Sequence, residues 1–367
     1  MASYDVAIVG AGPAGSTAAY RLATAGARVL LLDKATFPRD KPCGGGVTGR
    51  AARLLPFSIE PVVEAVVDRL DCGLRYRHRF SRSARGPLAY MTQRRLLDHF
   101  LLRKAAGAGA EVREGETVDP TALDARIVIG ADGCNGSSAK QLELAENVVH
   151  GVALEANYPH EPRFAGAMVV EIAVIHGGYG WIFPKGDHIN VGVGGNAEEG
   201  PRLRTELRRM CDAYGIDPDA ASETRGYRLP LRQPGSRLAR GRTAVIGDAA
   251  GLVDPFSGDG MYEAFLSAQL VSAAALEVLA GRAEGLEPYE AAVERRIAPL
   301  LRAGWGAKRA FERFPRRTYA LARLPVTFRA LEKLLVGDLP DPSVARGIEG
   351  TAIRALHRVS RRARSSG

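Results

Sequence analysis

Residues 4–25, YDVAIVGAGPAGSTAAYRLATA, decide the fold. An apolar run of strand type at 4–9 leads into the glycine-rich turn GAGPAG at 10–15, and the alanine-rich segment that follows is typical of a helix. In such a turn Gly10 permits a tight bend, Gly12 lets the backbone approach a pyrophosphate, and Gly15 lets the helix pack closely on the strand. Unpaired amides at the helix N-terminus face the phosphates. The stretch therefore predicts a dinucleotide-binding strand, turn and helix.

A second apolar run, residues 28–32, ends in Asp33, which lies 23 residues after Gly10. An acidic side chain at about this distance accepts hydrogen bonds from the ribose hydroxyls of a dinucleotide. A glycine-rich turn alone is a weak signal, because such turns also occur for purely structural reasons. Here strand, turn, helix, second strand and acid all agree, which strengthens the prediction of a dinucleotide site.

The chain has 367 residues, a length that suits two domains sharing a cofactor, and its 46% hydrophobic content can build a substantial core. Its cysteines are scattered without a CxxC pair or a histidine cluster, which argues against disulfides and against a metal site; they are Cys43, Cys72, Cys134 and Cys211. We therefore expect a reducing, cytoplasmic location. Residues 1–4 leave no room for a signal peptide. The longest apolar helix candidate, 262–280, contains Glu263, Gln269 and Glu277, which disfavours a membrane span.

The net charge of +9 belongs to the C-terminal region. Residues 302–367 hold 15 basic and 5 acidic side chains, whereas the first 301 residues are nearly neutral. Nucleic acid, an anionic membrane surface or an acidic substrate would each suit this basicity, but no nucleic-acid motif accompanies it. Between the basic residues, apolar ones recur at helical spacing, namely Leu321, Leu324, Phe328, Leu331 and Leu335. The pattern fits an amphipathic helix at a membrane interface, or equally a helix packed on the protein with a solvated basic face.

Residues 34–46 form a loop that ends in Cys43, Gly44, Gly45 and Gly46. Three consecutive glycines are costly in a regular element, because glycine loses the most backbone freedom on folding. They suggest a backbone that passes very close to a flat object, which beside a dinucleotide site would be a flavin ring. A mobile loop is the alternative. Cys43 would be a reactive or hydrogen-bonding group at the ring, or simply a small buried side chain.

The middle of the chain predicts a mainly parallel sheet that is interrupted by an antiparallel one. Strands alternating with a helix at 93–106 indicate the parallel sheet; we expect them at 74–80, 88–91, 111–113 and 126–129, the last leading into GADGCNGS at 130–137. The inserted antiparallel sheet is indicated by short runs at 148–158, 167–174, 178–183 and 188–193. Tyr179, Trp181 and Phe183 share one face of it, as an apolar wall or as ordinary sheet packing.

A helix at 198–214 and a buried strand at 242–246 follow, and the strand leads into GDAAGLVDPFSGDGMYEAFLSA at 247–268. The long helix that begins at Met261 carries partial positive charge at its N-terminus. Aimed at a flavin, that charge would favour the anionic reduced ring. Asp248 would lie where it can accept a hydrogen bond from a ribityl or ribose hydroxyl.

Several of these motifs together resemble the FAD-binding set of the aromatic-hydroxylase-like flavoproteins: GAGPAG at 10–15, Asp33, PCGGG at 42–46, Arg94-x-x-x-Asp98, GADG at 130–133 and GDAAGLVDPFSGDG at 247–260. The stretch YGWIFP at 179–184 is similar to the YxWxFP motif of the geranylgeranyl reductase family, where that strand lines a tunnel for an isoprenoid chain. PCGGG also suits that family. One departure is His176, where the family often has proline, and the region after about 285 matches no motif.

The resemblance implies an α/β fold with a Rossmann-type FAD-binding domain, an inserted antiparallel β-sheet substrate domain and a helical C-terminal region. The FAD-binding domain would comprise residues 1–72, 92–146 and 240–284. The substrate-binding sheet would comprise 73–91 and 147–239, and the basic helical region would be 285–367.

The resemblance also implies roles for individual residues. Those expected to bind FAD are Gly10, Gly12, Pro13, Ala14, Gly15, Asp33, Lys34, Cys43, Gly44, Gly45, Arg94, Val118, Asp132, Gly133, Gly247, Asp248, Gly258, Gly260 and Met261. Within this set Gly44 and Gly45 would face the isoalloxazine and Val118 the adenine. Arg94 would contact the phosphates or the ribityl chain. The substrate would contact Tyr179, Trp181, Phe183 and Pro184, and no metal is expected. The motifs contain no evident proton source: Cys43, a tyrosine, bound water and the flavin itself are the alternatives, and Cys43 is the catalytic candidate because its motif places it at the ring.

The implied activity is the reduction of C=C bonds in an isoprenoid, either a geranylgeranyl or polyprenyl lipid or a quinone side chain, by hydride transfer from reduced FAD. The sequence has no second glycine fingerprint, so NAD(P)H would bind transiently or a reductant such as a ferredoxin would supply electrons. A hydrophobic substrate suggests peripheral association with an anionic membrane, at the inner face of the cell membrane. Two alternatives stay open: a flavin-dependent monooxygenase on the same scaffold, and a flavin-binding protein whose basic tail recruits nucleic acid or a partner.

Overall fold

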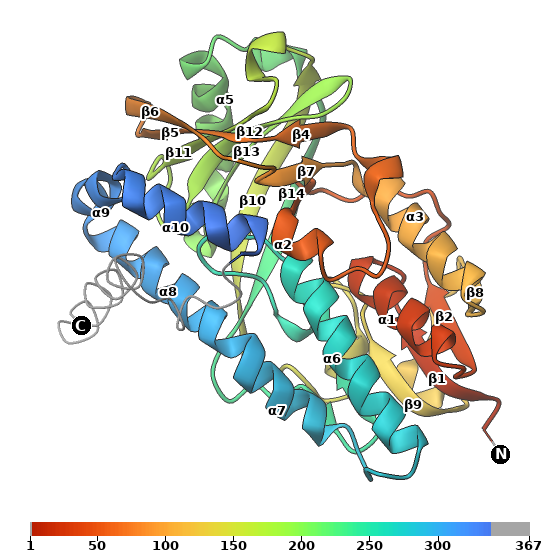
Figure 1. The fold of residues 1–367 in the computed structure, drawn as a ribbon. Coiled ribbons are helices and arrows are strands. Elements are labelled where there is room, and N and C mark those ends of the chain that lie inside the picture. The colour runs from red at the N-terminus through yellow and green to blue at the C-terminus, as the bar shows by residue number, and fades with distance from the viewer. Residues whose placement is uncertain (1, 339–367) are drawn as a thin grey trace.

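The computed structural model describes residues 2–338 and shows two large β-sheets with a group of C-terminal helices (Figure 1). The first sheet has the strand order β15-β16-β9-β1-β2-β8. Its strands are β1 (Tyr4–Val9), β2 (Val29–Asp33), β8 (Glu111–Glu114), β9 (Ala125–Gly130), β15 (Ala239–Arg240) and β16 (Thr243–Val245). All neighbours pair in parallel except β15 and β16, which confirms the predicted α/β fold with a mainly parallel sheet.

Helices cover this sheet because its strands are apolar on both faces. Val6, Ala7 and Ile8 in β1 are fully buried. The helix α1 (Pro13–Thr24) packs against both α3 (Arg94–Gly107) and α6 (Met261–Leu279). Gly15 allows the close packing that the sequence predicts, since a Cβ atom there would lie 1.8 Å from the carbonyl oxygen of Gly10.

The second sheet has the strand order β14-β10-β13-β12-β11-β5-β6. Its strands are β5 (Arg69–Leu74), β6 (Arg77–Ser83), β10 (Val148–Pro159), β11 (Ala167–Ile172), β12 (Tyr179–Pro184), β13 (His188–Asn196) and β14 (Ser222–Arg232). Apart from the parallel pair β11 and β5, these strands are antiparallel, which confirms the predicted inserted sheet. One face packs on α5 (Leu203–Ala213) through Ile182, Val191 and Val193. The other face lines the large cavity described below.

A small third sheet, with the order β3-β7-β4, lies next to the glycine loop at 42–46. Its strands are β3 (Gly46–Thr48), β4 (Ala65–Val67) and β7 (Ala89–Met91). Two α-helices of four residues each are α2 (Gly49–Ala52), which follows β3, and α4 (Ser138–Gln141), which follows β9. Gly46 pairs with Met91. The C-terminal end of the glycine loop is thereby fixed in a sheet.

Several predicted elements differ in the structure. The strand predicted at 88–91 is β7, which pairs antiparallel with β3 and β4 in the small third sheet and not in the parallel sheet. The strand predicted at 74–80 is a hairpin, since Arg75 and Tyr76 have positive φ angles of 51° and 62°, as a tight two-residue turn requires. The apolar pattern does not reveal this turn. The boundary predicted at residue 72 falls inside β5, which lies wholly in the second sheet. The helix predicted at 198–214 begins as a 3₁₀ segment containing Pro201, and α5 itself begins at Leu203.

The C-terminal region is helical, as predicted, through α7 (Glu287–Arg296), α8 (Ala298–Arg313), α9 (Pro315–Ala322) and α10 (Pro325–Val336). The single amphipathic helix predicted across 321–335 is broken, because Leu324 is extended and Pro325 begins α10. Proline lacks the N–H group that would continue a helix, and it disfavours helical backbone at the preceding residue. Residues 339–367 of the predicted basic region lie outside the described residues.

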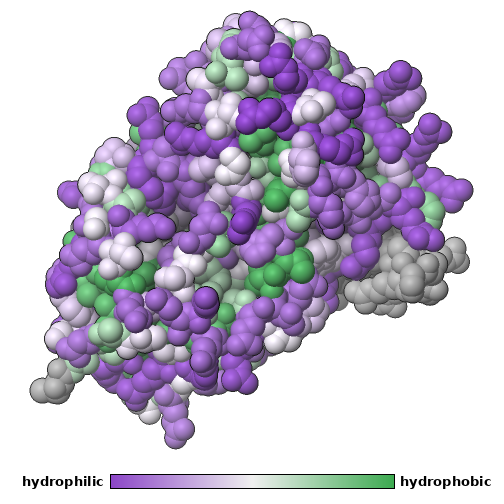
Figure 2. All heavy atoms as spheres, turned by 180° about the vertical axis from the view of Figure 1, so that it is seen from behind, coloured by the Kyte–Doolittle hydropathy of each residue, from purple (hydrophilic) through white to green (hydrophobic). Residues whose placement is uncertain are grey.

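The helix α6 is long and apolar enough, by length and composition, to cross a membrane. However, 67% of its apolar window is buried inside the protein, as in a core helix. Figure 2 shows the face opposite to that of Figure 1, where hydrophilic residues cover most of the surface and hydrophobic ones gather near the middle and toward one side.

Candidate active site

One cavity of about 900 Å³ lies where the two large sheets meet the C-terminal helices. Its wall contains the N-terminus of α1, the loop at 39–46, the aromatic strand β12 and residues of α8, α9 and α10. Cofactor and small-molecule pockets typically measure about 300–1,000 Å³. The cavity therefore joins the predicted cofactor motifs and the predicted substrate wall in a single site.

The N-terminus of α1 opens into the cavity through Gly12, Pro13 and Ala14. Gly12 is the N-cap and no side chain caps the helix, so the first backbone amides are available to a ligand. The nearest atom to a Cβ built on Gly12 would be Arg39 Nη2 at 3.7 Å, which leaves this edge of the turn open. The arrangement matches an anion site at a helix N-terminus.

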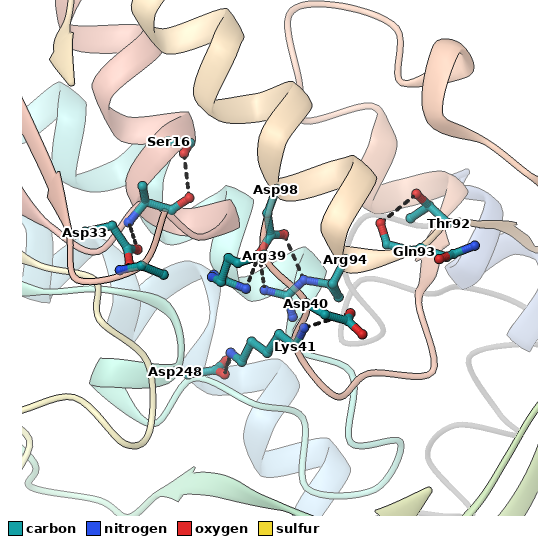
Figure 3. Close-up of polar contacts among 12 residues, drawn as sticks. Ser16, Asp33, Arg39, Asp40, Lys41, Thr92, Gln93, Arg94, Asp98 and Asp248 are labelled. Atoms are coloured by element: carbon teal, nitrogen blue, oxygen red, sulfur yellow. Dashed lines mark hydrogen bonds and ion pairs between the residues drawn. The ribbon is translucent and has the colours of Figure 1, made fainter. Parts of the chain in front are cut away.

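Asp33 lines the cavity, and its carboxylate also anchors the glycine-rich turn (Figure 3). Oδ2 accepts a hydrogen bond from the Ala11 N–H at 2.7 Å, and Oδ1 accepts one from the Ala35 N–H at 2.9 Å. A carboxylate oxygen has two lone pairs, so each oxygen retains capacity for a further donor. The predicted ribose contact remains available, while the same acid positions the turn.

A buried ion cluster forms the neighbouring wall (Figure 3). Asp98 is fully buried and receives two hydrogen bonds from Arg94, each of 2.8 Å. Arg39, which the sequence motifs do not include, adds an ion pair of 2.9 Å to the same carboxylate. One carboxylate thus holds two guanidinium groups at the cavity wall. The surplus positive charge suits the phosphate role predicted for Arg94.

Asp248 is held by two side chains that the sequence motifs do not include. Its Oδ2 accepts a hydrogen bond from the Tyr227 hydroxyl at 2.7 Å. The same oxygen forms an ion pair of 3.2 Å with Lys41 (Figure 3). Burial disfavours the ionised carboxyl, but the Lys41 ammonium and the Tyr227 hydroxyl outweigh it and hold the pKa of Asp248 below its ordinary value. Asp248 is therefore a carboxylate at neutral pH and can accept hydrogen bonds.

The glycine loop is held by side chains from the second sheet. Glu155 of β10 accepts the Cys43 N–H at 2.7 Å. Lys185, which directly follows β12 and is buried, donates to the carbonyls of Gly44 and Thr92, the latter at 2.9 Å. Burial lowers the pKa of Lys185 to about 8. These contacts give the loop a defined position, which favours the prediction of a ligand-contacting loop over that of a mobile one.

The glycines of this loop are required by close packing within the protein. A Cβ on Gly44 would lie 2.8 Å from the Phe183 ring. Gly45 has a φ of +71°, and a Cβ there would lie 2.0 Å from the Thr92 carbonyl oxygen. The loop therefore lies directly on the aromatic strand while its backbone still lines the cavity.

The predicted aromatic wall is present. Tyr179, Trp181 and Phe183 all line the cavity, and the ring centroids of successive pairs are 5.9 and 6.2 Å apart. Trp181 Nε1 donates to Asn190 Oδ1 at 2.9 Å, and the Tyr179 hydroxyl donates to the Ser257 carbonyl. Since these polar atoms are paired inside the protein, the wall presents apolar ring surface to the cavity.

Most of the predicted site residues line this cavity; besides those named above they are Lys34, Asp132, Gly133, Gly258, Gly260 and Met261. Five lie outside its wall: Gly10, Gly15, Val118, Pro184 and Gly247. A Cβ on Gly10 would lie 2.4 Å from the Ala131 carbonyl oxygen, and one on Gly247 would lie 2.9 Å from the Ala14 side chain. These glycines therefore allow close packing behind the wall. Val118 packs with Leu30 and Leu32, and its adenine contact stays a prediction.

Pattern reading missed five polar residues of the site: Arg39, Lys41, Glu155, Lys185 and Tyr227. Two of them carried a local signal. Lys185 directly follows the YGWIFP motif, and Glu155 is the acid within the otherwise apolar and small-residue run 152–156. The other three lie in segments whose approach to the cavity depends on tertiary folding.

The residues present fit FAD. The free amides at the N-terminus of α1 suit a pyrophosphate, and the Asp33 and Asp248 carboxylates suit hydroxyl donors. Two further carboxylate oxygens at the wall, Asp132 Oδ1 and Asp259 Oδ2, are buried and have no hydrogen-bond partner among the described residues. Buried polar atoms without partners cost free energy, which a bound ligand with donor groups would offset.

Comparison with known proteins supports this assignment. A family profile described as FAD dependent oxidoreductase matches residues 5–88. The chain is 32% identical over 313 residues to a menaquinone reductase of Mycobacterium tuberculosis, covering 71% of this chain and 73% of that protein. It is 30% identical over 316 residues to digeranylgeranylglycerophospholipid reductase 2 of Methanopyrus kandleri, covering 75% and 78% respectively.

Solved structures show the same fold. A geranylgeranyl bacteriochlorophyll reductase-like protein of Thermoplasma acidophilum matches with a TM-score of 0.74 at 21% identity, over 96% of this chain and 95% of that one. A flavin-dependent brominase matches with a TM-score of 0.77 at 18% identity, over 98% and 99%. At such identities the likeness concerns the fold and not the reaction.

Proposed function

The chain belongs to the geranylgeranyl reductase family of FAD-dependent oxidoreductases, and we propose that it saturates C=C bonds in the isoprenoid chain of a lipid or quinone. FAD is its cofactor and the enzyme is an oxidoreductase. When bound and reduced, FAD supplies a hydride for addition to an alkene carbon. NAD(P)H or a reductant of the ferredoxin class would restore the reduced cofactor.

The observation that carries this proposal is the continuation of the cavity beyond the glycine loop. Past the loop its wall is mostly apolar, with the rings of β12 and residues of α9 and α10 such as Tyr319, Phe328 and Leu331. The polar residues that α8, α9 and α10 add to it are Lys308, Thr318 and Thr327. A polyprenyl chain needs such an apolar channel. An aromatic substrate for hydroxylation needs a compact pocket with polar groups that fix its orientation.

The residues of the chain have separable tasks in this reaction. The aromatic wall holds the prenyl chain against the glycine loop, so that the reacting double bond is oriented next to the cofactor. The helices α9 and α10 cover the cavity and exclude water, which protects the reduced state from side reactions. Arg39, Arg94 and Lys41 supply positive charge at the cofactor end.

An anaerobic reoxidation assay tests the proposal. The FAD-bound protein is reduced with dithionite, and geranylgeranyl-bearing phospholipids or menaquinone are then added while flavin absorbance and product mass are followed. We expect reoxidation without oxygen and a product that has gained two hydrogen atoms per turnover. Reoxidation only after oxygen is admitted, with a product that has gained one oxygen atom, would identify a monooxygenase instead.

The aromatic wall makes a first prediction. Trp181→Ala should raise the KM for a prenyl substrate about 10- to 100-fold, because a fully buried large apolar side chain contributes about 1.5–3 kcal/mol of burial. Trp181→Phe keeps the apolar surface and loses only the hydrogen bond to Asn190, so its KM should stay within about threefold of wild type. Steady-state kinetics of both variants with the same substrate measure the difference. Equal KM values for both variants would remove Trp181 from the substrate wall.

We further propose that α9 and α10 dock on an anionic membrane at the cytoplasmic face. Leu321, Leu324 and Leu331 are 37%, 46% and 36% exposed. Leu331 also lines the cavity, so the exposed apolar side chains adjoin its entrance. Exposed cations surround them, namely Arg316, Arg317, Arg323, Arg329 and Lys333. Basic and apolar side chains on one surface favour binding to anionic lipid headgroups.

The docking proposal predicts the effect of placing acids on this surface. The double variant Leu324→Asp and Leu331→Asp should bind phosphatidylglycerol vesicles about tenfold more weakly than wild type, because apolar burial is lost and like charge is added. Vesicle co-sedimentation at low salt measures the change. Val66→Asp is a matched control, since Val66 is 46% exposed on β4, outside this surface. Unchanged binding of the double variant would refute docking through these helices.

A further inference from the structure

Glu155 lies where the glycine loop meets the aromatic wall. The strand register places Glu155 of β10 opposite Gly192 of β13, and Gly192 opposite Trp181 of β12. Residues opposite one another in adjacent strands point to the same face, so Glu155 and Trp181 both point into the cavity. The indole covers the space above Gly192, where a Cβ would lie 2.1 Å from Trp181 Cζ2.

The Glu155 carboxylate contacts the loop itself. It accepts the Cys43 N–H at 2.7 Å, and Gly44 and Gly45 follow directly in the cavity wall. The predicted donor, the Cys43 thiol, has a different partner: its Sγ lies 3.4 Å from the Gly45 N–H, which donates to it. The carboxyl of Glu155, on the second sheet, therefore binds the residue next to Gly44, which is predicted to face the flavin.

Each of the other carboxyls in the cavity wall has at least one oxygen bound by a neighbouring group. Asp40 pairs with Arg225, and Asp132 and Asp254 accept backbone amides of the loops that follow them. Asp33 holds the glycine-rich turn through two backbone amides, and Asp248 is paired with Lys41 and Tyr227. Asp259 accepts the Met261 N–H at the start of α6, within the predicted FAD motif. Glu155 differs from them because it lies on the same sheet face as the aromatic wall, beside the predicted position of the prenyl chain.

We propose that Glu155 is the catalytic residue that donates the proton in alkene reduction, acting from its place between the glycine loop and Trp181. The inference rests on the proposed function. As a hydride adds to one alkene carbon, the Glu155 O–H bond breaks and a new C–H bond forms at the neighbouring carbon. The electron pair comes from reduced FAD, which a nicotinamide or ferredoxin-class reductant regenerates. The resulting carboxylate takes a proton from water before the next turnover.

The surroundings of Glu155 suit this role. Burial raises the pKa of its carboxyl to about 7, although the Cys43 N–H and the Lys185 ammonium both favour the ionised form. The titratable and charged groups that face it are Asp40 and Cys43 on the loop, Lys185 after β12 and Arg225 opposite it on β14. A general acid works best with a pKa near the working pH. The same Cys43 N–H and Lys185 ammonium stabilise the carboxylate that proton transfer leaves.

Glu155→Gln tests the proposal, since it keeps the size of the side chain and an oxygen that accepts the Cys43 N–H but cannot donate a carboxylic proton. We expect anaerobic reoxidation of the reduced variant by a prenyl lipid to be about 100-fold slower at pH 7. Wild-type rates should fall as pH rises through about 7, because Glu155 loses its proton there, and this alkaline limb should be absent in the variant. Substrate binding, followed through flavin absorbance, should change less than about threefold.

Two further variants and one spectroscopic readout accompany this measurement. Glu155→Asp shortens the side chain by one methylene group. Its reoxidation rate should be low, but the rate should still fall as the pH is raised, because an acid is still present. Glu223→Gln, at an exposed carboxyl on β14, should react like wild type. Independently of turnover, ¹³C NMR of the FAD-bound protein labelled at glutamate carboxyl carbons should show a resonance that titrates near pH 7. That resonance should be missing from Glu155→Gln.

The outcomes separate this inference from the proposed function. If wild type reduces no prenyl substrate, the proposed function fails and the proton-donor role fails with it. If wild type reduces the substrate and Glu155→Gln matches its rate and pH profile, only the role of Glu155 is overturned. If Cys43→Ser and not Glu155→Gln removes the alkaline limb, the thiol is the donor and the role of Glu155 is likewise overturned.

Discussion

Asp98→Asn is expected to lower the free energy of unfolding by about 3–5 kcal/mol, the usual cost of breaking a buried ion pair by removing one partner. Asp98 is fully buried and binds Arg94 through two hydrogen bonds and Arg39 through an ion pair. An amide in its place accepts fewer hydrogen bonds and leaves both guanidinium groups without a counter-charge. Urea denaturation of the FAD-free protein measures the loss.

The matched control is a carboxyl in an exposed ion pair. Glu277 pairs with Arg282 at the end of α6, and their side chains are 48% and 63% exposed. Glu277→Gln should change the free energy of unfolding by less than about 0.5 kcal/mol, because solvent screens exposed pairs. A loss at Asp98 no larger than that at Glu277 would show that the buried cluster contributes little to stability.

Lys185→Met should weaken FAD binding about 100-fold. The Lys185 ammonium donates to the carbonyls of Gly44 and Thr92, and charge-assisted hydrogen bonds contribute about 1.5–3 kcal/mol each. Without them the glycine loop loses the position that it needs beside the cofactor. Titration of the apoprotein with FAD, followed by quenching of flavin fluorescence, measures the dissociation constant.

The protonation of Lys185 also predicts how its substitution changes the pH dependence of stability. Burial lowers its pKa from 10.5 to about 8, so between these pH values the folded protein binds fewer protons than the unfolded chain. Lys185 therefore contributes a rise in stability with pH across this window, because burying the charged form is unfavourable. Buried thiols and phenols whose pKa is raised, such as Cys72 and Tyr227, contribute a fall with rising pH. The free energy of unfolding of Lys185→Met, relative to that of wild type, should therefore fall as pH rises from about 8 to 10.5. Lys140→Met, at an exposed position, should keep the wild-type FAD affinity and the wild-type pH dependence of stability. An FAD dissociation constant unchanged by Lys185→Met would show that Lys185 does not position the glycine loop for the cofactor.

The local parts of the fold were predictable because short-range chemistry determines them. Gly10 lies in the turn and Gly15 in the helix that follows it, so the glycine requirement arises within six residues. In the structure a Cβ atom on Gly15 would lie 1.8 Å from the Gly10 carbonyl oxygen. The period-two spacing of Tyr179, Trp181 and Phe183 likewise places three rings on one face, whatever the strand packs against. The break between α9 and α10 at Pro325 could also have been predicted, because a proline restricts only its own backbone and that of the residue before it.

The site residues that were missed are brought together by contacts between segments far apart in the sequence. Glu155 and Cys43 are 112 residues apart, and Asp248 and Lys41 are 207 residues apart, so no local pattern relates them. The hairpin at Arg75 and Tyr76 was missed for another reason: positive φ angles are unusual for these residue types, although the two-residue turn between β5 and β6 requires them. Sequence motifs thus predicted the backbone that approaches the cofactor, and tertiary folding supplied the side chains that hold that backbone.

The helices α9 and α10, which cover the cavity, belong to the last part of the described chain to leave the ribosome. The Tyr319 hydroxyl in α9 lies 2.8 Å from the Cys72 carbonyl oxygen and 2.7 Å from that of His78, across separations of 247 and 241 residues. Long-range contacts of this kind form late, because closing a long loop costs conformational entropy. The glycine-rich turn at 10–15 is therefore synthesised long before the helices α9 and α10 that cover the cavity. Until α9 and α10 have folded, any flavin held by the chain faces water and oxygen, so these two helices decide when a bound cofactor becomes shielded.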